Sequence, residues 1–358
     1  MNPISTNAQS SSPTPGDEFK IPLWNEVLNF RGSAGYKDNV LLSQTNINGS
    51  TFASVGGDLV VFRLPTGVWM FNFLASADYT RYFSSKISTS DETAIGLAQA
   101  TRDLGDQWNI GFGLNYMFQH QVLDLTALET NAVGEVIGHN FTTRWFTRKD
   151  FKFNWIEVEA SGTRQLLEAP LDNFWQMGPK TTVGHRFSDA SDITLGYQWT
   201  YVMFDTRSQV SAGGVNLPGT ALRLDTHTFE LGWHQAWDAK KRWHSSLTAA
   251  FDLSQDNGSG YFDYYQYRLA SKLEYRAGTW KLNAQCRFGV FDFPLEQAEA
   301  FSPTPLTRSY VSASLHAEKK LPKRFNIFAD YSYDRSFSNA EGLRYGVNTV
   351  SLGFGWQL

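Results

Sequence analysis

The chain ends with Ser351-Leu352-Gly353-Phe354-Gly355-Trp356-Gln357-Leu358. Successive side chains of an extended strand point to opposite faces, so one face of this segment is apolar and the other is small and polar. The apolar face carries Leu352, Phe354, Trp356 and Leu358, and the other carries Ser351, Gly353, Gly355 and Gln357. A chain that ends on such a strand suits a sheet that closes on its own first strand, with an apolar phase outside and a polar one inside.

The same alternation recurs along the chain from about Trp24 onward, in about 16 segments, each long enough to cross a bilayer as a tilted strand of roughly 9–11 residues. In residues 280–290, for example, Trp280, Leu282 and Phe288 alternate with Lys281 and Arg287. An Arg or Lys that faces lipid at mid-bilayer costs roughly 2–4 kcal/mol. We therefore expect Lys281 and Arg287 to face inward.

The connections between these segments alternate between short and long. The short ones, built from Gly, Pro, Asp and Lys as hairpin turns are, fall at 64–67, 103–106, 148–150, 188–191, 238–241, 277–279 and 321–323. The long ones fall near 37–51, 84–92, 121–135, 166–173, 206–221, 255–262, 294–308 and 336–343. Tight turns on one side and longer loops on the other are typical of outer-membrane barrels.

These patterns predict an all-β fold: a closed antiparallel transmembrane β-barrel of about 16 strands, with short periplasmic turns and longer extracellular loops. A soluble sandwich or propeller is the alternative, but neither has a reason to alternate its loop lengths so regularly. The sequence contains no apolar run of about 18 residues, so it predicts no membrane-spanning helix. The side that each residue faces is ambiguous in 54–62 and 93–102, and Pro179 must occupy a bulge or an unpaired position in its strand.

We expect two parts in the chain. Residues 1–20 are rich in Ser, Thr, Pro and Asn and predict a disordered N-terminal tail, and residues 21–358 form the barrel. The sequence shows no apolar signal-peptide core, so we expect it to be a mature chain or to begin downstream of the true start.

The polar faces of the strands predict a lumen lined by charges of both signs. The residues expected to line it are Asp78, Arg144, Glu157, Glu159, Lys180, Arg186, Glu230, Arg268, Lys272, Lys281, Arg287 and Asp330. Opposed charges would create a transverse field in a hydrated pore; alternatively, they pair across neighbouring strands and stiffen the wall. Sixteen strands enclose more volume than side chains fill. The loop at Asp205 to Arg223 and the tail before Lys20 are the segments that could narrow it.

Other functions find little support in the sequence. The net charge of −4 offers no basic footprint for nucleic acid. Cys286 is the single cysteine, and the seven histidines lack ligand spacing, so we expect neither a metal site nor a cofactor. His244 and Ser246 share an inward face without a recognisable orienting residue, and Ser245 points outward, so we do not expect an enzyme.

Two short motifs resemble known barrels. Ser351, Gly353, Trp356 and Leu358 resemble the C-terminal assembly signal of bacterial outer-membrane proteins, although that family usually ends in Phe or Trp. Gly35-Tyr36-Lys37-Asp38-Asn39-Val40-Leu41 resembles the opening of β-barrel porins encoded with exopolysaccharide machinery, with Lys37 in place of the usual first acid.

These resemblances imply a protein of the bacterial outer membrane, with outer-membrane lipids and the barrel-assembly machinery as partners. They imply an outer-membrane channel for small solutes or an exit pore for an exopolysaccharide. The alternative is a non-conducting structural or adhesive barrel with a filled lumen. A homo-oligomer and a polysaccharide are further partners that the resemblance allows; nucleic acid is not.

Overall fold

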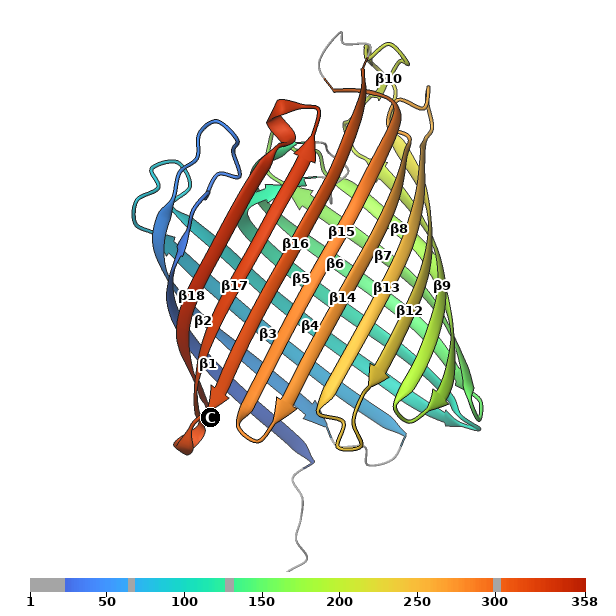
Figure 1. Cartoon of the computed structure of the whole chain (residues 1–358). Helices are drawn as coiled ribbons and strands as arrows, with labels where there is room; N and C mark the ends of the chain where they lie inside the picture. The colour runs from blue at the N-terminus through green and yellow to red at the C-terminus, as the bar shows by residue number, and fades with distance from the viewer. Residues whose placement is uncertain (1–22, 64–67, 126–131, 299–303) are drawn as a thin grey trace, which may run out of the picture.

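The computed structural model describes residues 23–63, 68–125, 132–298 and 304–358. Its sixteen long strands form one closed antiparallel barrel (Figure 1), so the predicted fold class is confirmed. These wall strands are β1 Trp24–Lys37, β2 Ser50–Arg63, β3 Trp69–Tyr82, β4 Ser90–Gly105, β5 Trp108–Asp124, β6 Val133–Asp150, β7 Asn154–Leu167, β8 Phe174–Ser188, β9 Ser191–Phe204, β12 Arg223–Ala236, β13 Trp243–Asp256, β14 Tyr264–Ala277, β15 Trp280–Gln297, β16 Pro305–Lys320, β17 Phe325–Ser338 and β18 Tyr345–Gln357.

Each wall strand pairs with the wall strands before and after it in the chain, β9 pairing with β12, and the first wall strand, β1, pairs with the last, β18. The two short strands between them, β10 Gln209–Val210 and β11 Asn216–Leu217, form a separate ribbon in a loop. Two short 3₁₀ helices, η2 Pro322–Arg324 and η3 Glu341–Leu343, lie in connections. None of the helical segments in the described residues is long or apolar enough to cross a membrane.

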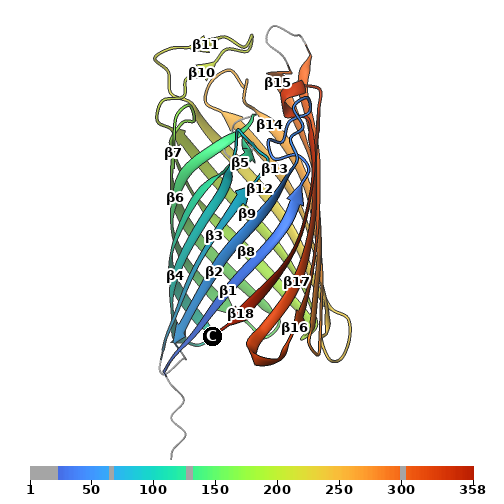
Figure 2. The same cartoon turned by 90° about the vertical axis from the view of Figure 1, so that its left-hand side faces the viewer.

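Among the described residues, connections of six residues or fewer lie at one end of the barrel, called the turn end below, and connections of six residues or more lie at the other, the loop end (Figure 2). The expected alternation of turns and loops therefore holds in the described residues, except that the connection at 237–242 is as long as those at 168–173 and 339–344. The predicted tail and the predicted turn at 64–67 lie outside them. Buried apolar residues gather at the loop end, where Phe174, Phe204 and Leu222 pack together, and not in a central core.

The barrel closes where β1 meets β18, in a register that runs from Asn29 opposite Gln357 to Lys37 opposite Thr349. Gly353 lies in the middle of this seam. A Cβ atom at this position would lie 2.6 Å from the Gly32 carbonyl oxygen, so the close approach of the two strands requires glycine. Trp356 stacks on Phe325 of β17, with ring centroids 6.1 Å apart.

The motif at Gly35 to Leu41 fastens the loop end of the same seam. The Asp38 carboxylate accepts hydrogen bonds from the Asn348 backbone N–H (2.8 Å) and side-chain amide (2.7 Å). The Asn39 amide donates to the Gly346 carbonyl oxygen at 3.0 Å. Val40 is fully buried in a cluster at the loop end. The motif thus joins the first loop to the last strand. Asp38 and Asn39 therefore have a structural role in closing the barrel.

Pro179 of β8 lies opposite Ala160 of β7 but is unpaired on the side of β9, so the unpaired position expected for it holds on one side only. Paired positions between β8 and β9 are Met177 with Tyr201 and then Lys180 with Gln198, so the register is unbroken and no bulge forms. A side chain on Gly178 would collide with the Trp199 carbonyl oxygen of β9. Glycine and proline together let the two strands pass closely where the ladder lacks a donor.

Candidate functional site

The wall strands present alternate side chains to the two faces of the barrel. The outer set is apolar: Leu195, Leu352 and Phe354 are each more than 60% exposed. The other set forms the lumen face, which is mostly polar. All of the predicted pore-lining residues lie on the lumen face by their strand registers, namely Asp78, Arg144, Glu157, Glu159, Lys180, Arg186, Glu230, Arg268, Lys272, Lys281, Arg287 and Asp330. Their lining of an open pore stays a prediction.

Most of these charges are paired with other charges on the lumen face, on the next strand, on the second strand along or, for Lys272, on the same strand. The pairs are Asp78 with Arg31 (3.0 Å), Arg144 with Glu159 (3.1 Å), Glu157 with Arg148 (4.0 Å), Lys180 with Glu230 (3.8 Å), Arg186 with Asp150 (3.2 Å), Arg268 with Asp252 (2.7 Å), Lys272 with Glu274 (3.4 Å) and Asp330 with His316 (2.6 Å). The sequence pattern missed Asp58, which pairs with Arg31. Pairing of the charges within the wall is one of the two arrangements that the sequence predicts for them.

Lys281 and Arg287 differ from the other predicted residues. Neither forms an ion pair within the residues that the structure describes, and the Arg287 side chain is exposed on the lumen face. An exposed cation without a partner presents its full charge to a solute in the lumen. These two side chains therefore make the local field of β15 positive.

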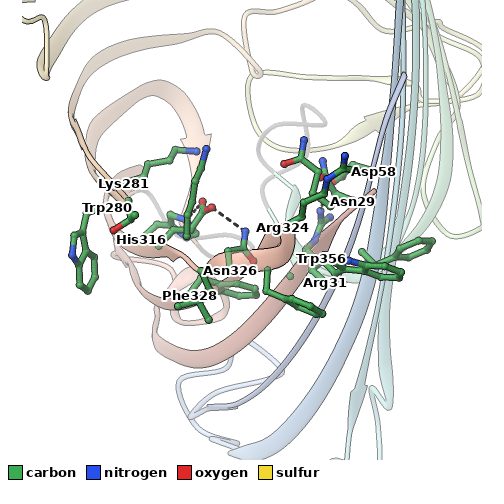
Figure 3. Close-up of a pocket in the computed structure, with 18 of the residues that line it drawn as sticks. Asn29, Arg31, Asp58, Trp280, Lys281, His316, Arg324, Asn326, Phe328 and Trp356 are labelled. Carbon is green, nitrogen blue, oxygen red and sulfur yellow. Dashed lines mark hydrogen bonds and ion pairs between the residues drawn. The ribbon is translucent and has the colours of Figure 1, made fainter. Parts of the chain in front are cut away.

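A cavity of about 770 Å³ lies on the lumen face at the turn end. Figure 3 shows Arg31 and Asp58 on one side of it, His316 and Lys281 on the other, and Arg324 between them. Its charged lining consists of the basic residues Arg31, Arg276, Lys281, Lys320 and Arg324, the acids Asp58, Glu318 and Asp330, and His316. Bases outnumber acids here, so an anion entering this cavity meets the more favourable potential.

A second cavity, of about 680 Å³, lies nearer the loop end and is bounded by a contact that crosses the lumen. The Asp124 carboxylate, at the tip of β5, forms an ion pair with Arg308 of β16 and accepts a hydrogen bond from the Tyr345 hydroxyl of β18 at 3.0 Å. Around the wall, β5 and β16 are separated by β4, β3, β2, β1, β18 and β17. The β5–β6 hairpin must therefore lean across the opening.

The segment expected to narrow the lumen, at Asp205 to Arg223, lies elsewhere. It packs on the loop between β13 and β14, where the Ser259 hydroxyl donates to the Val210 carbonyl oxygen at 2.7 Å and the Gln209 amide donates to the Asn257 carbonyl oxygen at 3.4 Å. Loop-to-loop bonds hold it at the rim. The tail before Lys20 lies outside the described residues.

The lumen face of β1 to β5 carries an aliphatic surface that the sequence pattern did not predict. Direct cross-strand neighbours are Val27 with Val60, Val60 with Leu74, and Leu74 with Leu97. Ile95 continues the surface and lies opposite Met117. These strands include both segments whose facing was ambiguous, because their inner and outer faces are both apolar. We call these six residues the aliphatic wall.

The residues with hydrolase-like spacing lie near the turn end of β13. His244 and Ser246 share the lumen face, but no hydrogen bond joins them in the described part of the chain. Glu274, which lies opposite His244, is engaged by Lys272 and Arg276 instead. Within the described ranges, no three His, Cys, Asp or Glu side chains are grouped to hold a metal ion.

Outside the wall, one ion pair shifts the pKa of a loop carboxyl. Arg164 donates from Nη1 to Oδ1 of Asp205 at 2.8 Å, and this hydrogen bond lowers the pKa of Asp205 below its ordinary value. The Arg164 guanidinium also lies over the Trp175 ring, 5.2 Å from its centroid. The pair anchors the start of the β9–β12 loop to the outer surface of the wall.

No protein-family model matches the chain, and no curated protein matches its sequence. Solved structures do share its shape. A loop-deletion mutant of OmpT, an outer membrane protein of Vibrio cholerae, is 9% identical with a TM-score of 0.50, and the match covers 94% of this chain and 99% of that one. This likeness supports the fold alone: a sixteen-strand barrel similar to outer-membrane porins.

Two further structures are similar to a lesser degree. OccAB3 of Acinetobacter baumannii is 9% identical with a TM-score of 0.49, over 94% of this chain and 99% of that one. A bacterial polysaccharide outer membrane secretin is 10% identical with a TM-score of 0.44, over 93% of this chain and 98% of that one.

Proposed function

We propose that this chain is a channel of the bacterial outer membrane through which small solutes pass along the charged lumen. The observation that carries the proposal is the pair of polar cavities, of about 770 and 680 Å³, on the inner face of a wall whose outer face is apolar. Charged side chains line both cavities and would be hydrated, as a water-filled passage requires. A bilayer is the environment that suits the exposed outer face.

Export of an exopolysaccharide is the finer alternative that the Gly35 to Leu41 resemblance implies. Asp38 and Asn39 of that motif make hydrogen bonds that close the seam. They are therefore engaged in the wall and offer no sugar-binding surface, and we place small solutes first. We also propose that the charged residues of the lumen face set the selectivity, with Lys281 and Arg287 favouring anions.

Single-channel recording in planar bilayers with potassium chloride tests the proposal. We expect stepwise current at an applied voltage after insertion of protein folded in detergent. Electrically silent insertion of folded protein would contradict a channel and favour the non-conducting barrel. Protein that stays dissolved as a compact monomer without detergent would contradict the membrane assignment itself.

Ion selectivity provides the first variant test. Replacing Lys281 and Arg287 with Gln removes two unpaired positive charges from the lumen face, so the reversal potential in a salt gradient should move toward cation selectivity. Lys319→Gln is the matched control, because Lys319 lies on the outer face, 5.3 Å from the Trp280 ring centroid. An equal shift in both variants would show that the lumen face does not set the selectivity.

A further inference from the structure

We propose that the solutes of this channel are amphiphilic anions, whose hydrocarbon part lies against the aliphatic wall while the acid group contacts β14 and β15 on the other side of the lumen. The proposal rests on the channel function above and names its substrate class. Two independent features of the lumen face carry it: an aliphatic surface with no packing partner in the described structure, and a basic surface opposite.

The aliphatic wall is continuous. Val27, Val60, Leu74 and Leu97 are direct neighbours on four adjacent strands, and directly opposed side chains in a sheet have Cβ atoms about 4.5–5.5 Å apart. Leu74, Ile95 and Leu97 remain 36%, 39% and 37% exposed. The row therefore presents an apolar strip to the lumen, which a hydrocarbon chain would remove from water.

The residues of β4 show that this surface is not a by-product of membrane insertion. Its lumen face carries Ile95 and Leu97, whereas its outer face carries Ala94, Gly96, Ala98 and Ala100. Contact with lipid favours large apolar side chains on the outer face. The large apolar side chains of β4 instead face the lumen, where insertion into a bilayer does not require them. Burial in a core does not account for it either, because these side chains remain more than a third exposed.

The opposite wall is basic. In the order of strands around the barrel, β13, β14 and β15 lie eight positions from β3, β4 and β5, which is half of the circumference. Figure 1 shows β14 and β15 on the near wall and β3 to β5 on the far one. The lumen faces of β14 and β15 carry five bases, Arg268, Lys272, Arg276, Lys281 and Arg287, and one acid, Glu274. Glu274 pairs with Lys272 and Arg276, and Asp252 of β13 pairs with Arg268, so the bases remain in excess.

The two surfaces also lie at matching depth. Leu74 is the sixth residue of β3 from the turn end, and Lys272 is the sixth residue of β14 from the same end. Leu97 is the ninth residue of β4 from that end and Arg268 the tenth of β14. A solute at mid-lumen therefore meets hydrocarbon on one side and positive charge on the other, which suits an organic acid with an aliphatic chain.

Block of the potassium chloride current by sodium hexanoate, compared with sodium acetate, tests this pairing. Hexanoate has four more methylenes, and each should improve binding about twofold when one side of the chain leaves water. We therefore expect hexanoate to block at a concentration roughly tenfold or more below that of acetate. Hexylammonium, with the opposite charge, should block less well than hexanoate.

Two sets of variants separate the two surfaces. Leu74→Asn combined with Leu97→Asn should reduce the hexanoate-to-acetate ratio to about twofold or less, since the apolar contact is lost. Asn115→Ser is the matched control, because Asn115 lies directly opposite Leu97 on the lumen face and is polar. Lys272→Gln combined with Arg287→Gln should weaken block by both acids and leave their ratio unchanged.

The outcomes distinguish this proposal from the channel function. Absence of any potassium chloride current would defeat the channel itself. A normal current with equal block by the two acids, or with no block by either, would leave the channel standing and overturn the amphiphile, since another molecule or another part of the chain would then cover the aliphatic wall. An unchanged ratio in the Leu74→Asn, Leu97→Asn variant would also overturn it.

Discussion

Asp124 forms a contact that crosses the opening of the barrel. It lies at the end of β5, yet it is bonded to Arg308 and Tyr345 on strands across the lumen. The Arg308 side chain is only 1% exposed and also donates to the Ser336 hydroxyl at 3.2 Å. A buried guanidinium depends on its carboxylate partner, because an uncompensated buried charge is costly. The contact therefore holds the β5–β6 hairpin over the lumen.

Replacing Asp124 with Asn should release this hairpin. We expect the free energy of unfolding in detergent micelles to fall by about 1–3 kcal/mol, less than for a fully buried pair because Asp124 is 23% exposed. Single-channel conductance should rise as the lumen widens. Glu341→Gln is the control, since Glu341 is an exposed acid at the same end. Conductance that stays the same while stability falls would show that the hairpin does not restrict the current.

A second prediction concerns pH and the loop after β9. The bond from Arg164 lowers the folded-state pKa of Asp205, so the pair adds stability at pH values above the unfolded pKa of about 3.9 and loses it as the pH falls through the lower folded value. Protease cleavage of the 205–222 loop should therefore increase only in acid. Asp205→Asn should cleave faster at neutral pH and show a flatter pH profile. If Asp205→Asn shows the same pH dependence of cleavage as the parent protein, the Arg164–Asp205 pair does not hold the loop.

The basic residues near the middle of the lumen face could be predicted individually, because an Arg or Lys that faces lipid at mid-bilayer costs roughly 2–4 kcal/mol. Lys281 and Arg287 are examples. Their partners could not be predicted, since a pair such as Arg268 with Asp252 depends on register between strands. The Asp124 contact was beyond prediction for the same reason: it joins residues 184 positions apart.

At the scale of the strand, alternation determines facing only where the two faces differ in polarity. In β15, Lys281 and Arg287 alternate with Trp280 and Phe288, and the predicted facing agrees with the structure. In β4 both faces are apolar, so the pattern could not distinguish them. The two strands whose facing could not be predicted, β2 and β4, both contribute to the aliphatic wall, where the lumen departs from the usual polar lining.

The close passage of β8 and β9 gives a prediction for a single element. Gly178→Ala would place a methyl group against the Trp199 carbonyl oxygen, so we expect a loss of about 1–3 kcal/mol in the free energy of unfolding from overpacking. Gly96→Ala is the control, because a Cβ atom there has no neighbour within 4 Å. Guanidinium unfolding in micelles measures both. Equal stability of the two variants would mean that β8 shifts freely at Pro179.

For the molecule as a whole, closure of the barrel depends on the seam between β1 and β18. The seam has nine paired positions, whereas β1 and β2 have fourteen. It gains extra bonds at its loop end from Asp38 and Asn39. The first loop and the last strand therefore support each other, although they lie at opposite ends of the chain.

Loss of the Asp38 contacts should loosen this seam. In Asp38→Ala we expect hydrogen exchange to quicken at the loop end of β1 and β18, because both bonds to Asn348 are removed. Exchange in β8 and β9, on the far side of the wall, should stay the same and serves as the internal control. Exchange rates equal to those of the parent protein in both regions would show that the Asp38 contacts do not stabilise the seam.

Cys286 lies on the outer face of β15 and is the single thiol of the chain. A fluorescent dye attached to it would sit among acyl chains, where quenchers placed at known depths along the lipid report how far the protein has inserted. In a Cys286→Ser background, a cysteine introduced at a chosen lumen position would be the single site of labelling. The native thiol therefore reports insertion depth without any substitution. A single substitution, Cys286→Ser, gives a background free of thiols for mapping the lumen.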